Sequence, residues 1–314
     1  MDVVEMLRQT REKKNSRPIT FSAPMVRYST LPFRMLCHNH GCDVVFSPMI
    51  VAKGFNKSEQ LRNIELQSDP LERPLLVQFA SKDAEEFVTA SEYVVNQCEG
   101  VNLNCGCPSK KVRKVGLGSA LLDKPELIAD IIKTSHSRLG EKQNFSVSAK
   151  IRILPDQGET IELCKRIEKM HSDFIIIHAR NRFQKDHETP NYEMMSLIRD
   201  SIQIPIVANG SIFNQQDWEL YKNKTRCEGV MSARGLLKNP GMFEGSTLTK
   251  PEYVQELWDL IKKHKASHSK YETTKKMFGR ITNDLLNKND RILLQQCKNE
   301  EQLKEFLSER DLLN

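Results

Sequence analysis

Residues 101–118 read VNLNCGCPSKKVRKVGLG, a strand-like run that ends in a turn and leads directly into basic residues. Similar short runs rich in Val, Ile and Phe recur about every 25 to 30 residues along the chain. Eight such runs are present: PITFSAPM (18–25), CDVVFSPMI (42–50), PLLVQFA (74–80), GVNLNCG (100–106), FSVSAKIRI (145–153), DFIIIHAR (173–180), IPIVANGSI (204–212) and CEGVMSARG (227–235). Between them the apolar residues are spaced three or four apart, as in KPELIADIIKTSHSRL (124–139), which predicts helices. Apolar strands that alternate with helices indicate a parallel sheet covered on both faces.

The number of strand–helix units predicts the fold class. Eight units within about 235 residues favour an α/β fold of the (β/α)8 TIM-barrel type over an open doubly wound sheet. The first strand is also not followed by the Gly-rich dinucleotide turn that opens many doubly wound folds. After Pro251 the strand pattern stops and amphipathic helical spacing continues to the end. We therefore expect an N-terminal extension (1–17), a catalytic TIM barrel (18–245) and a small all-helical C-terminal domain (251–314).

Composition sets broad limits on the environment. The 314 residues include 47 Lys and Arg against 41 Asp and Glu, a formal net charge of +6. This mild excess permits a nucleic-acid partner without requiring one. The eight cysteines are scattered through a chain too long to need disulfides, which favours a reducing compartment. The sequence shows neither a secretory peptide nor a long apolar span, so we expect no membrane association and a cytoplasmic or nuclear location, or both.

Two clusters of basic residues predict a polyanionic partner. One follows the turn at residues 105–108, and the other lies between Lys262 and Arg291, where nine Lys or Arg accompany three acidic residues. A charge run alone is usually a solvated helix face, but two basic clusters in one chain favour an extended surface that binds RNA or DNA. The candidate RNA-binding residues are Lys110, Lys111, Arg113, Lys114, Arg180, Lys262, Lys263, Lys275, Lys276 and Arg280.

Polar residues at the predicted strand ends outline a pocket, because TIM-barrel active sites lie at the carboxyl ends of the strands. The last two predicted strands end in Ala208-Asn209-Gly210-Ser211 and Ala233-Arg234-Gly235. These segments either bind a phosphate group through their backbone N–H groups or only turn the chain. Lys150, inside a strand, either stabilises negative charge on a reduced flavin or extends to solvent. His178 either donates a hydrogen bond to a flavin or to the substrate, or it is a structural histidine. Gln78 either contacts the flavin or caps its strand.

The turn at residues 105–108 holds the candidate catalytic thiol. Cys105 is nearer the strand, whereas Cys107 precedes Pro108 beyond the strand end, so Cys107 is the better candidate. Cationic neighbours lower the pKa of a thiol and make it more useful as an acid, base or nucleophile. A Cys-x-Cys pair without further Cys or His at ligand spacing does not make a zinc site, and we expect no metal.

Several segments together resemble the signature segments of the tRNA-dihydrouridine synthases: NLNCGCPSKKV (102–112), APMV (23–26) followed by LPFR (31–34), IHAR (177–180) and VANGSI (207–212). The chain is most similar to the eukaryotic enzymes that act at positions 20a and 20b of the tRNA D-loop. The resemblance implies an FMN-binding barrel, a C-terminal helical tRNA-binding domain, and NADPH or NADH as reductant. It also implies tRNA as the substrate, and we expect no obligate protein partner.

Carried onto this sequence, the resemblance implies that Cys107 protonates uracil C5 while reduced FMN delivers hydride to C6. The implied flavin-binding residues are Pro24, Met25, Val26, Gln78, Lys150, His178, Asn209, Gly210, Ser211, Ala233 and Arg234. Ala179 and Ala233 stand where many relatives have Gly, and residues 180–190 depart from the usual Thr-rich loop. Two other functions stay open: an FMN barrel oxidoreductase that reduces a small free pyrimidine or enone, and a tRNA-binding protein without catalysis.

Overall fold

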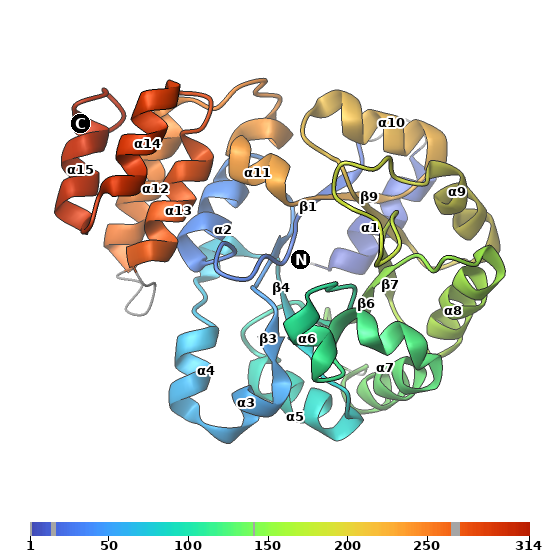
Figure 1. Ribbon diagram of the computed structural model, residues 1–314. Coiled ribbons are helices and arrows are strands. Elements are labelled where there is room, and N and C mark those ends of the chain that lie inside the picture. The colour runs from blue at the N-terminus through green and yellow to red at the C-terminus, as the bar shows by residue number, and fades with distance from the viewer. Residues whose placement is uncertain (1, 14–16, 141, 265–270) are drawn as a thin grey trace.

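The computed structural model describes residues 2–13, 17–140, 142–264 and 271–314, and its central element is a barrel of parallel strands (Figure 1). The strands follow the order β1-β9-β8-β7-β6-β5-β4-β2, and the short β3 pairs with β4 beside that path. A parallel bridge between Phe21 and Val44 joins β1 to β2 and closes the ring. The strand bounds are β1 (Ile19–Ser22), β2 (Val45–Phe46), β3 (Ile50–Val51), β4 (Leu75–Ala80), β5 (Gly100–Cys105), β6 (Ser146–Arg152), β7 (Phe174–His178), β8 (Ile206–Asn209) and β9 (Gly229–Ser232). The predicted TIM barrel is confirmed.

Helices cover the outside of the barrel between successive strands (Figure 1). Several begin at a side chain that accepts a backbone N–H of the first turn, such as Asp83, Asp156 and Asn214, which satisfies donors that the helix itself leaves free. The bounds are α2 (Leu31–Asn39), α3 (Ala52–Lys57), α4 (Glu59–Glu65), α5 (Ala84–Val94), α6 (Lys110–Lys114), α7 (Pro125–Leu139), α8 (Gln157–Lys169), α9 (Tyr192–Ser201), α10 (Gln215–Thr225) and α11 (Arg234–Lys238). Three 3-10 turns complete the set: η1 (Pro70–Glu72), η2 (Gly118–Asp123) and η3 (Pro240–Glu244).

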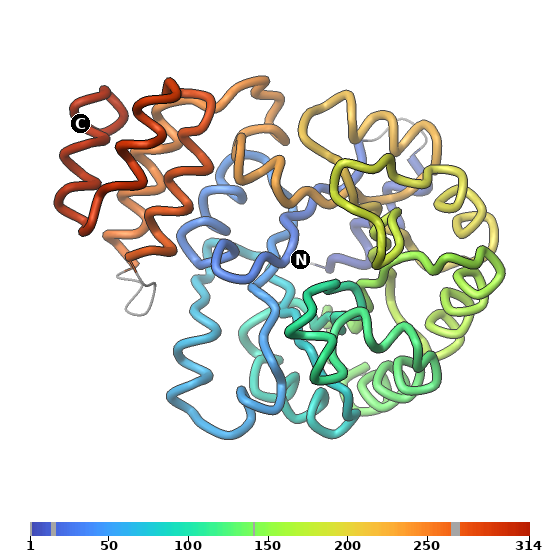
Figure 2. The backbone as a smooth tube through the Cα atoms, in the orientation of Figure 1, coloured from blue at the N-terminus to red at the C-terminus, as the bar shows by residue number. Residues whose placement is uncertain are grey.

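The N-terminal segment is part of the barrel rather than an appendage. Its helix α1 (Val3–Glu12) buries Leu7 completely, and Leu7 belongs to the core cluster that contains Phe21 and Phe174 of the strands. Arg11 bonds Glu228, just before β9, at 2.6 Å, so α1 lies at the amino-terminal end of the barrel. The first described residues, drawn in dark blue, accordingly lie near the middle of the ring of helices (Figure 2).

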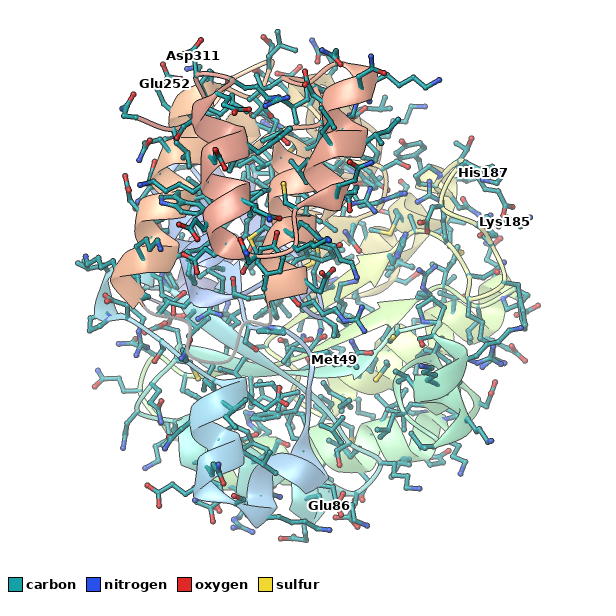
Figure 3. The ribbon with its side chains drawn as sticks, turned by 60° about the vertical axis from the view of Figure 1, so that its left-hand side comes forward. Met49, Glu86, Lys185, His187, Glu252 and Asp311 are labelled. Atoms are coloured by element: carbon teal, nitrogen blue, oxygen red, sulfur yellow. The ribbon has the colours of Figure 1, made fainter. Side chains whose placement is uncertain are left out.

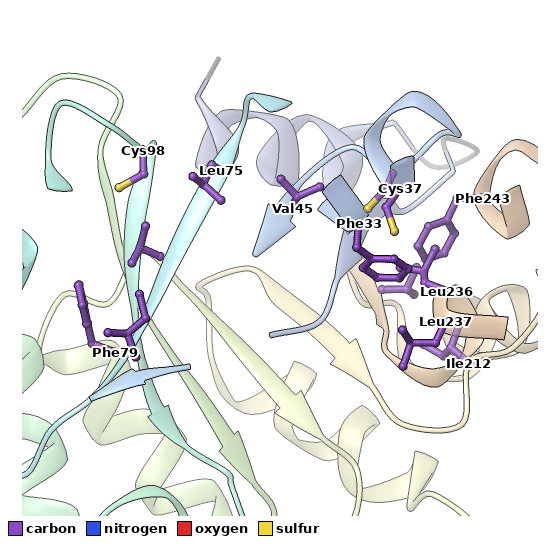
Figure 4. Packing of buried hydrophobic residues seen from close by; sticks show 14 of the residues in the cluster. Phe33, Cys37, Val45, Leu75, Phe79, Cys98, Ile212, Leu236, Leu237 and Phe243 are labelled. Atoms are coloured by element: carbon purple, nitrogen blue, oxygen red, sulfur yellow. The ribbon is translucent and has the colours of Figure 1, made fainter. Parts of the chain in front are cut away.

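Four further helices follow in the described part of the C-terminal segment, called the helical domain below: α12 (Pro251–His264), α13 (Tyr271–Ile281), α14 (Lys288–Gln296) and α15 (Glu300–Ser308). They lie together at one side of the barrel (Figure 3). One hydrophobic core cluster runs from the barrel helices into this domain and includes Phe33, Phe243, Trp258 and Phe278. Figure 4 shows its barrel part, where Phe33 of α2 and Phe243 of η3 pack close together. The described helices include none that is both long and apolar enough to cross a membrane.

Candidate active site at the barrel mouth

The turn after β5 presents one thiol and buries the other. Cys105 is fully buried, and burial raises the pKa of its thiol. Cys107 is partly exposed, and its backbone is held from two sides: Asn104 Oδ1 accepts its N–H at 3.1 Å, and its carbonyl accepts the N–H of Ser119 at 3.0 Å. Gly118 is required beside it, because its φ is +63° and a Cβ there would lie 2.8 Å from the Cys107 carbonyl oxygen. The backbone that carries the accessible thiol is therefore held in place.

The buried amide side chains of Asn104, Gln78 and Asn102 form a hydrogen-bonded ladder that leads from this turn into the barrel. Asn104 Nδ2 donates to Gln78 Oε1 at 2.6 Å, and Gln78 Nε2 donates to Asn102 Oδ1 at 2.8 Å. Asn102 in turn donates to Ser148 Oγ at 2.9 Å. Gln78 was expected to contact a flavin or cap its strand; here it is fully buried and both ends of its amide bond to protein. Its observed role is to orient Asn104. Sequence reasoning missed Asn102, although a polar residue inside an apolar strand is a signal of such a network.

Lys150 extends from β6 to the neighbourhood of β8. Its Nζ donates to Asn209 Oδ1 at 2.9 Å, and Asn209 is fixed by its own bond to the Met231 carbonyl at 2.8 Å. Burial, together with the Arg152 guanidinium, lowers the pKa of Lys150 to about 7. Among the described residues no carboxylate forms an ion pair with this ammonium group, and the nearby Cys107 thiol acts in the opposite direction and raises the pKa of Lys150.

His178, at the end of β7, is surrounded by cations. Burial is the main cause that lowers its pKa well below the usual value, and the charges of Lys150, Arg152, Arg180 and Arg234 act in the same direction. The imidazole is therefore neutral at physiological pH. A neutral ring surrounded by several cations suits a site that receives an anionic group.

Arg180 was expected to contact RNA, but its side chain lies inside the protein. Its side chain is almost fully buried, with Nε bonded to the Glu188 carbonyl at 2.6 Å and Nη2 to Ser211 Oγ at 2.5 Å. Its Nη1 lies 3.3 Å from His178 Nε2. A guanidinium with these partners does not face solvent, so Arg180 belongs to the cationic group around His178.

The loops after β8 and β9 pack closely against His178. Gly210 has a φ of +128°, and a Cβ there would lie 3.0 Å from His178 Cδ2, so the close approach needs glycine. Arg234, which follows Ala233, is half exposed and pairs with Asp186 at 3.1 Å. The structure thus brings together Lys150, His178, the residues 209–211 and Arg234, as the sequence predicted.

Residues 24–26, which follow β1 after Ala23, lie at the side of the mouth that faces the helical domain. Pro24 and Met25 are partly buried, whereas Val26 is 52% exposed. Val26 lines a cleft of about 520 Å³ together with Met49 and Lys276. Figure 3 shows Met49 where the helical domain meets the barrel. This cleft adjoins the mouth and takes its lining from both domains.

The predicted basic residues divide into exposed and structural ones. Lys110, Lys111 and Lys114 are exposed on α6, directly after the Cys107 turn, and Arg113 is partly buried. In the helical domain the exposed ones are Lys262, Lys263, Lys276 and Arg280. Lys275 is a correction: it is only 7% exposed, and its Nζ donates to the carbonyls of Cys297 at 3.0 Å and Gln295 at 3.2 Å. These bonds satisfy the end of α14, so Lys275 is not available to RNA.

The described residues contain no group of three or more His, Cys, Asp or Glu side chains placed to hold a metal ion. The mouth presents the accessible thiol of Cys107, a ladder of buried amides and a group of cations around His178.

The sequence of this chain is similar to that of several known proteins. The family model described as "Dihydrouridine synthase (Dus)" matches residues 21–312. An uncharacterized tRNA-dihydrouridine synthase-like protein of Caenorhabditis elegans is 40% identical over 240 residues, 76% of this chain and 84% of the relative. A human protein named as tRNA-dihydrouridine(20a/20b) synthase-like is 38% identical over 239 residues, 76% of this chain and 74% of the relative. The tRNA-dihydrouridine(20a/20b) synthase of Schizosaccharomyces pombe is 36% identical over 270 residues, 86% of this chain and 82% of the relative. The names of the human and S. pombe proteins include NAD(P)+.

Solved structures share the architecture at low sequence identity. The old yellow enzyme homologue of Zymomonas mobilis superposes with a TM-score of 0.54 at 12% identity and covers 76% of this chain and 92% of that chain. At this identity the likeness concerns the fold alone.

Proposed function

Because this chain belongs to the dihydrouridine synthase family, we propose that it reduces the C5–C6 double bond of uridines 20a and 20b in the D-loop of tRNA. The curated names of the human and S. pombe relatives support these positions. The observation that carries the proposal is the accessible thiol of Cys107, held at the same end of the barrel as the cationic group around His178. The exposed lysines of α6 directly follow that thiol.

The residues present fit FMN as the cofactor. Lys150 is a partly buried ammonium group without a carboxylate partner in the described chain, and the anionic edge of a reduced flavin would supply a negative charge beside it. Arg234 is half exposed and follows the turn of β9, where TIM barrels commonly hold a phosphate. Lys150, His178, Asn209 and Arg234 would hold the cofactor. When bound, FMN supplies hydride for uracil C6 after reduction by NADPH or NADH.

Cys107 completes the reduction of the base. Addition of hydride at C6 leaves enolate charge across C5 and the C4 carbonyl, and an acid placed at C5 must quench it. The Cys107 thiol donates that proton, and Asn104 and Ser119 hold its backbone in position. The target base must leave its stack to reach the thiol, which costs a few kcal/mol. Phosphate contacts by the exposed lysines of α6 offset that cost, so affinity should fall with salt.

Cys107→Ala tests the assignment of the acid. The variant should stay yellow and oxidise NADPH, but should no longer form dihydrouridine in tRNA. Normal dihydrouridine formation by the variant would show that Cys107 is not the acid. Mapping dihydrouridine in tRNA from cells that lack this protein tests the positions. Equally efficient reduction of free uracil by the unchanged chain would instead favour a small-molecule reductase.

A further inference from the structure

The loop between β7 and α9 holds an aromatic ring out in solvent. Phe183 is 65% exposed, although the loop around it is ordered by its own hydrogen bonds. Asn181 Oδ1 accepts the N–H of Phe183 at 2.9 Å and that of Gln184 at 3.1 Å, and Gln184 Oε1 accepts the N–H of Asn181 at 2.8 Å. Such a turn fixes the backbone at the ring. Figure 3 shows Lys185 and His187 of the same loop on the surface of the barrel.

Two independent links tie this loop to the turn of the catalytic thiol. Arg152 donates to the Gly106 carbonyl at 2.9 Å and to the Asn181 carbonyl at 3.1 Å, so one guanidinium holds the residues next to Cys107 and Phe183. Arg182 donates to the Ser119 carbonyl at 2.9 Å, and the N–H of Ser119 donates to the Cys107 carbonyl. The backbone that carries the exposed ring is therefore tied to the backbone that carries the thiol.

A guanidinium lies beside the ring, and the helix with the exposed lysines is close by in the fold. The Arg182 guanidinium lies 5.1 Å from the centre of the Phe183 ring and is itself anchored by Asp123 at 2.6 Å. Asp123 belongs to η2, which packs against α6 with its exposed lysines. Single-stranded RNA is bound by aromatic faces on which bases stack, beside cations that contact the backbone. A stable protein interface instead buries roughly 800 Å² per partner, which one ring does not supply.

We propose that Phe183 is a stacking platform for a nucleobase that flanks the target uridine in bound tRNA. When one base leaves its stack to reach Cys107, its neighbour loses a stacking partner. The face of Phe183 replaces that partner and holds the distorted loop open. This role rests on the proposed function, and it assigns Phe183 to binding rather than to the chemistry.

Two substitutions test whether tRNA binding needs the aromatic face of Phe183 or only an apolar side chain at this position. Phe183→Leu keeps an apolar side chain and removes the face, whereas Phe183→Trp keeps a larger face. The Leu variant should raise the KM for tRNA by about 5- to 150-fold, the range expected for one lost base stack, with kcat much less affected. The Trp variant should stay close to the unchanged chain. Leu248, which is 66% exposed in the segment before α12, provides the control: Leu248→Ala should leave KM unchanged.

A direct readout uses tRNA with 2-aminopurine at the nucleotides next to the target uridine. Its fluorescence should be quenched on binding to the unchanged chain and to the Trp variant, but not on binding to the Leu variant. Equal KM and equal quenching in all three proteins would overturn the stacking role, including the case in which Phe183 contacts a protein instead. If quenching depended on the aromatic face while no dihydrouridine formed, the stacking role would stand and the proposed reaction would fail.

Discussion

The side-chain oxygen of Asn104 accepts the backbone N–H of Cys107 at 3.1 Å, while the amide of Asn104 donates to Gln78. One side chain thus connects the buried amide ladder to the position of the thiol. A displacement of about 1 Å at a reacting group costs up to roughly 100-fold in rate. The geometry of this turn is therefore as important to the proposed reaction as the identity of the thiol.

Asn104→Ala should lower kcat for dihydrouridine formation by about 10- to 100-fold, with a small effect on the KM for tRNA. The reason is that the thiol stays present but loses the contact that positions its backbone. Ser109→Ala changes the same loop at an exposed residue whose side chain makes no cap bond to α6, and it should retain kcat. Steady-state kinetics with saturating NADPH measures both, and equal kcat values for the two variants would contradict the positioning role.

Lys150→Met should change the pH dependence of stability in the flavin-free protein. The pKa of Lys150 is about 7 in the folded chain and about 10.4 when unfolded, so the unfolded chain binds more protons between these values. Stability then rises with pH across this window, and the Met variant should lose that rise. Urea unfolding at pH 6, 8 and 9 tests it, with Lys142→Met as an exposed control. The Lys150 variant should also retain less FMN during purification.

His40→Ala should weaken the contact between barrel and helical domain at low pH. His40 lies between Glu256 at 2.6 Å and Glu244 at 3.1 Å, and it packs against Tyr253. Burial alone would lower the pKa of His40, but the hydrogen bonds of both glutamates outweigh it, and the pKa is raised. This stabilisation is complete below about pH 6.5, the unfolded pKa, and is lost as pH rises through the folded pKa.

Thermal unfolding between pH 5.5 and 8.5 measures this effect. The unchanged chain should lose more stability than the Ala variant across that range, and His187→Ala, at an exposed loop residue, should behave like the unchanged chain. Parallel curves for all three proteins would remove His40 from the interdomain contact.

Lys275 and Lys276 should respond oppositely to substitution, although they are neighbours. Lys275→Met removes the ammonium donor of the Gln295 carbonyl and one of the two donors of the Cys297 carbonyl, which keeps the Tyr271 hydroxyl, and should lower the free energy of unfolding by about 1–3 kcal/mol. Lys276→Ala removes an exposed cation at the cleft. It should leave stability unchanged and reduce the salt slope of tRNA binding, which is the slope of log affinity against log salt concentration, by about one. A salt slope altered equally by both variants would contradict the structural role of Lys275.

Leu7→Ala should destabilise the barrel, because Leu7 is fully buried in the core cluster of the strand residues. The expected loss is about 2–5 kcal/mol of unfolding free energy, typical of a buried Leu truncated to Ala. Arg8→Ala, at the next and exposed position, should change it by less than about 0.5 kcal/mol. If chemical denaturation gave equal midpoints for both variants, α1 would be an appendage after all.

The sequence predicted best where local pattern and burial coincide. Each of the eight apolar runs contains a strand, because strands buried on both faces need continuous apolar residues whatever their neighbours are. The preference for Cys107 over Cys105 followed from the turn after the strand, and Cys105 is indeed fully buried. The sequence did not show that Arg180 and Lys275 are buried and bonded to protein, because a cation in a sequence looks the same whether it meets solvent or backbone carbonyls.

By itself, the sequence determined the barrel, its helical domain and the set of polar residues at the strand ends, since hydrophobic period and turn residues are local properties. Only the tertiary structure decided that α1 fills the end of the barrel, that Gln78 supports Asn104, and that Arg152 joins the loops of Cys107 and Phe183. These relationships join residues far apart along the chain. Periodicity says which side of a segment is buried, but the partner that buries it is set by how the closed barrel brings distant segments together.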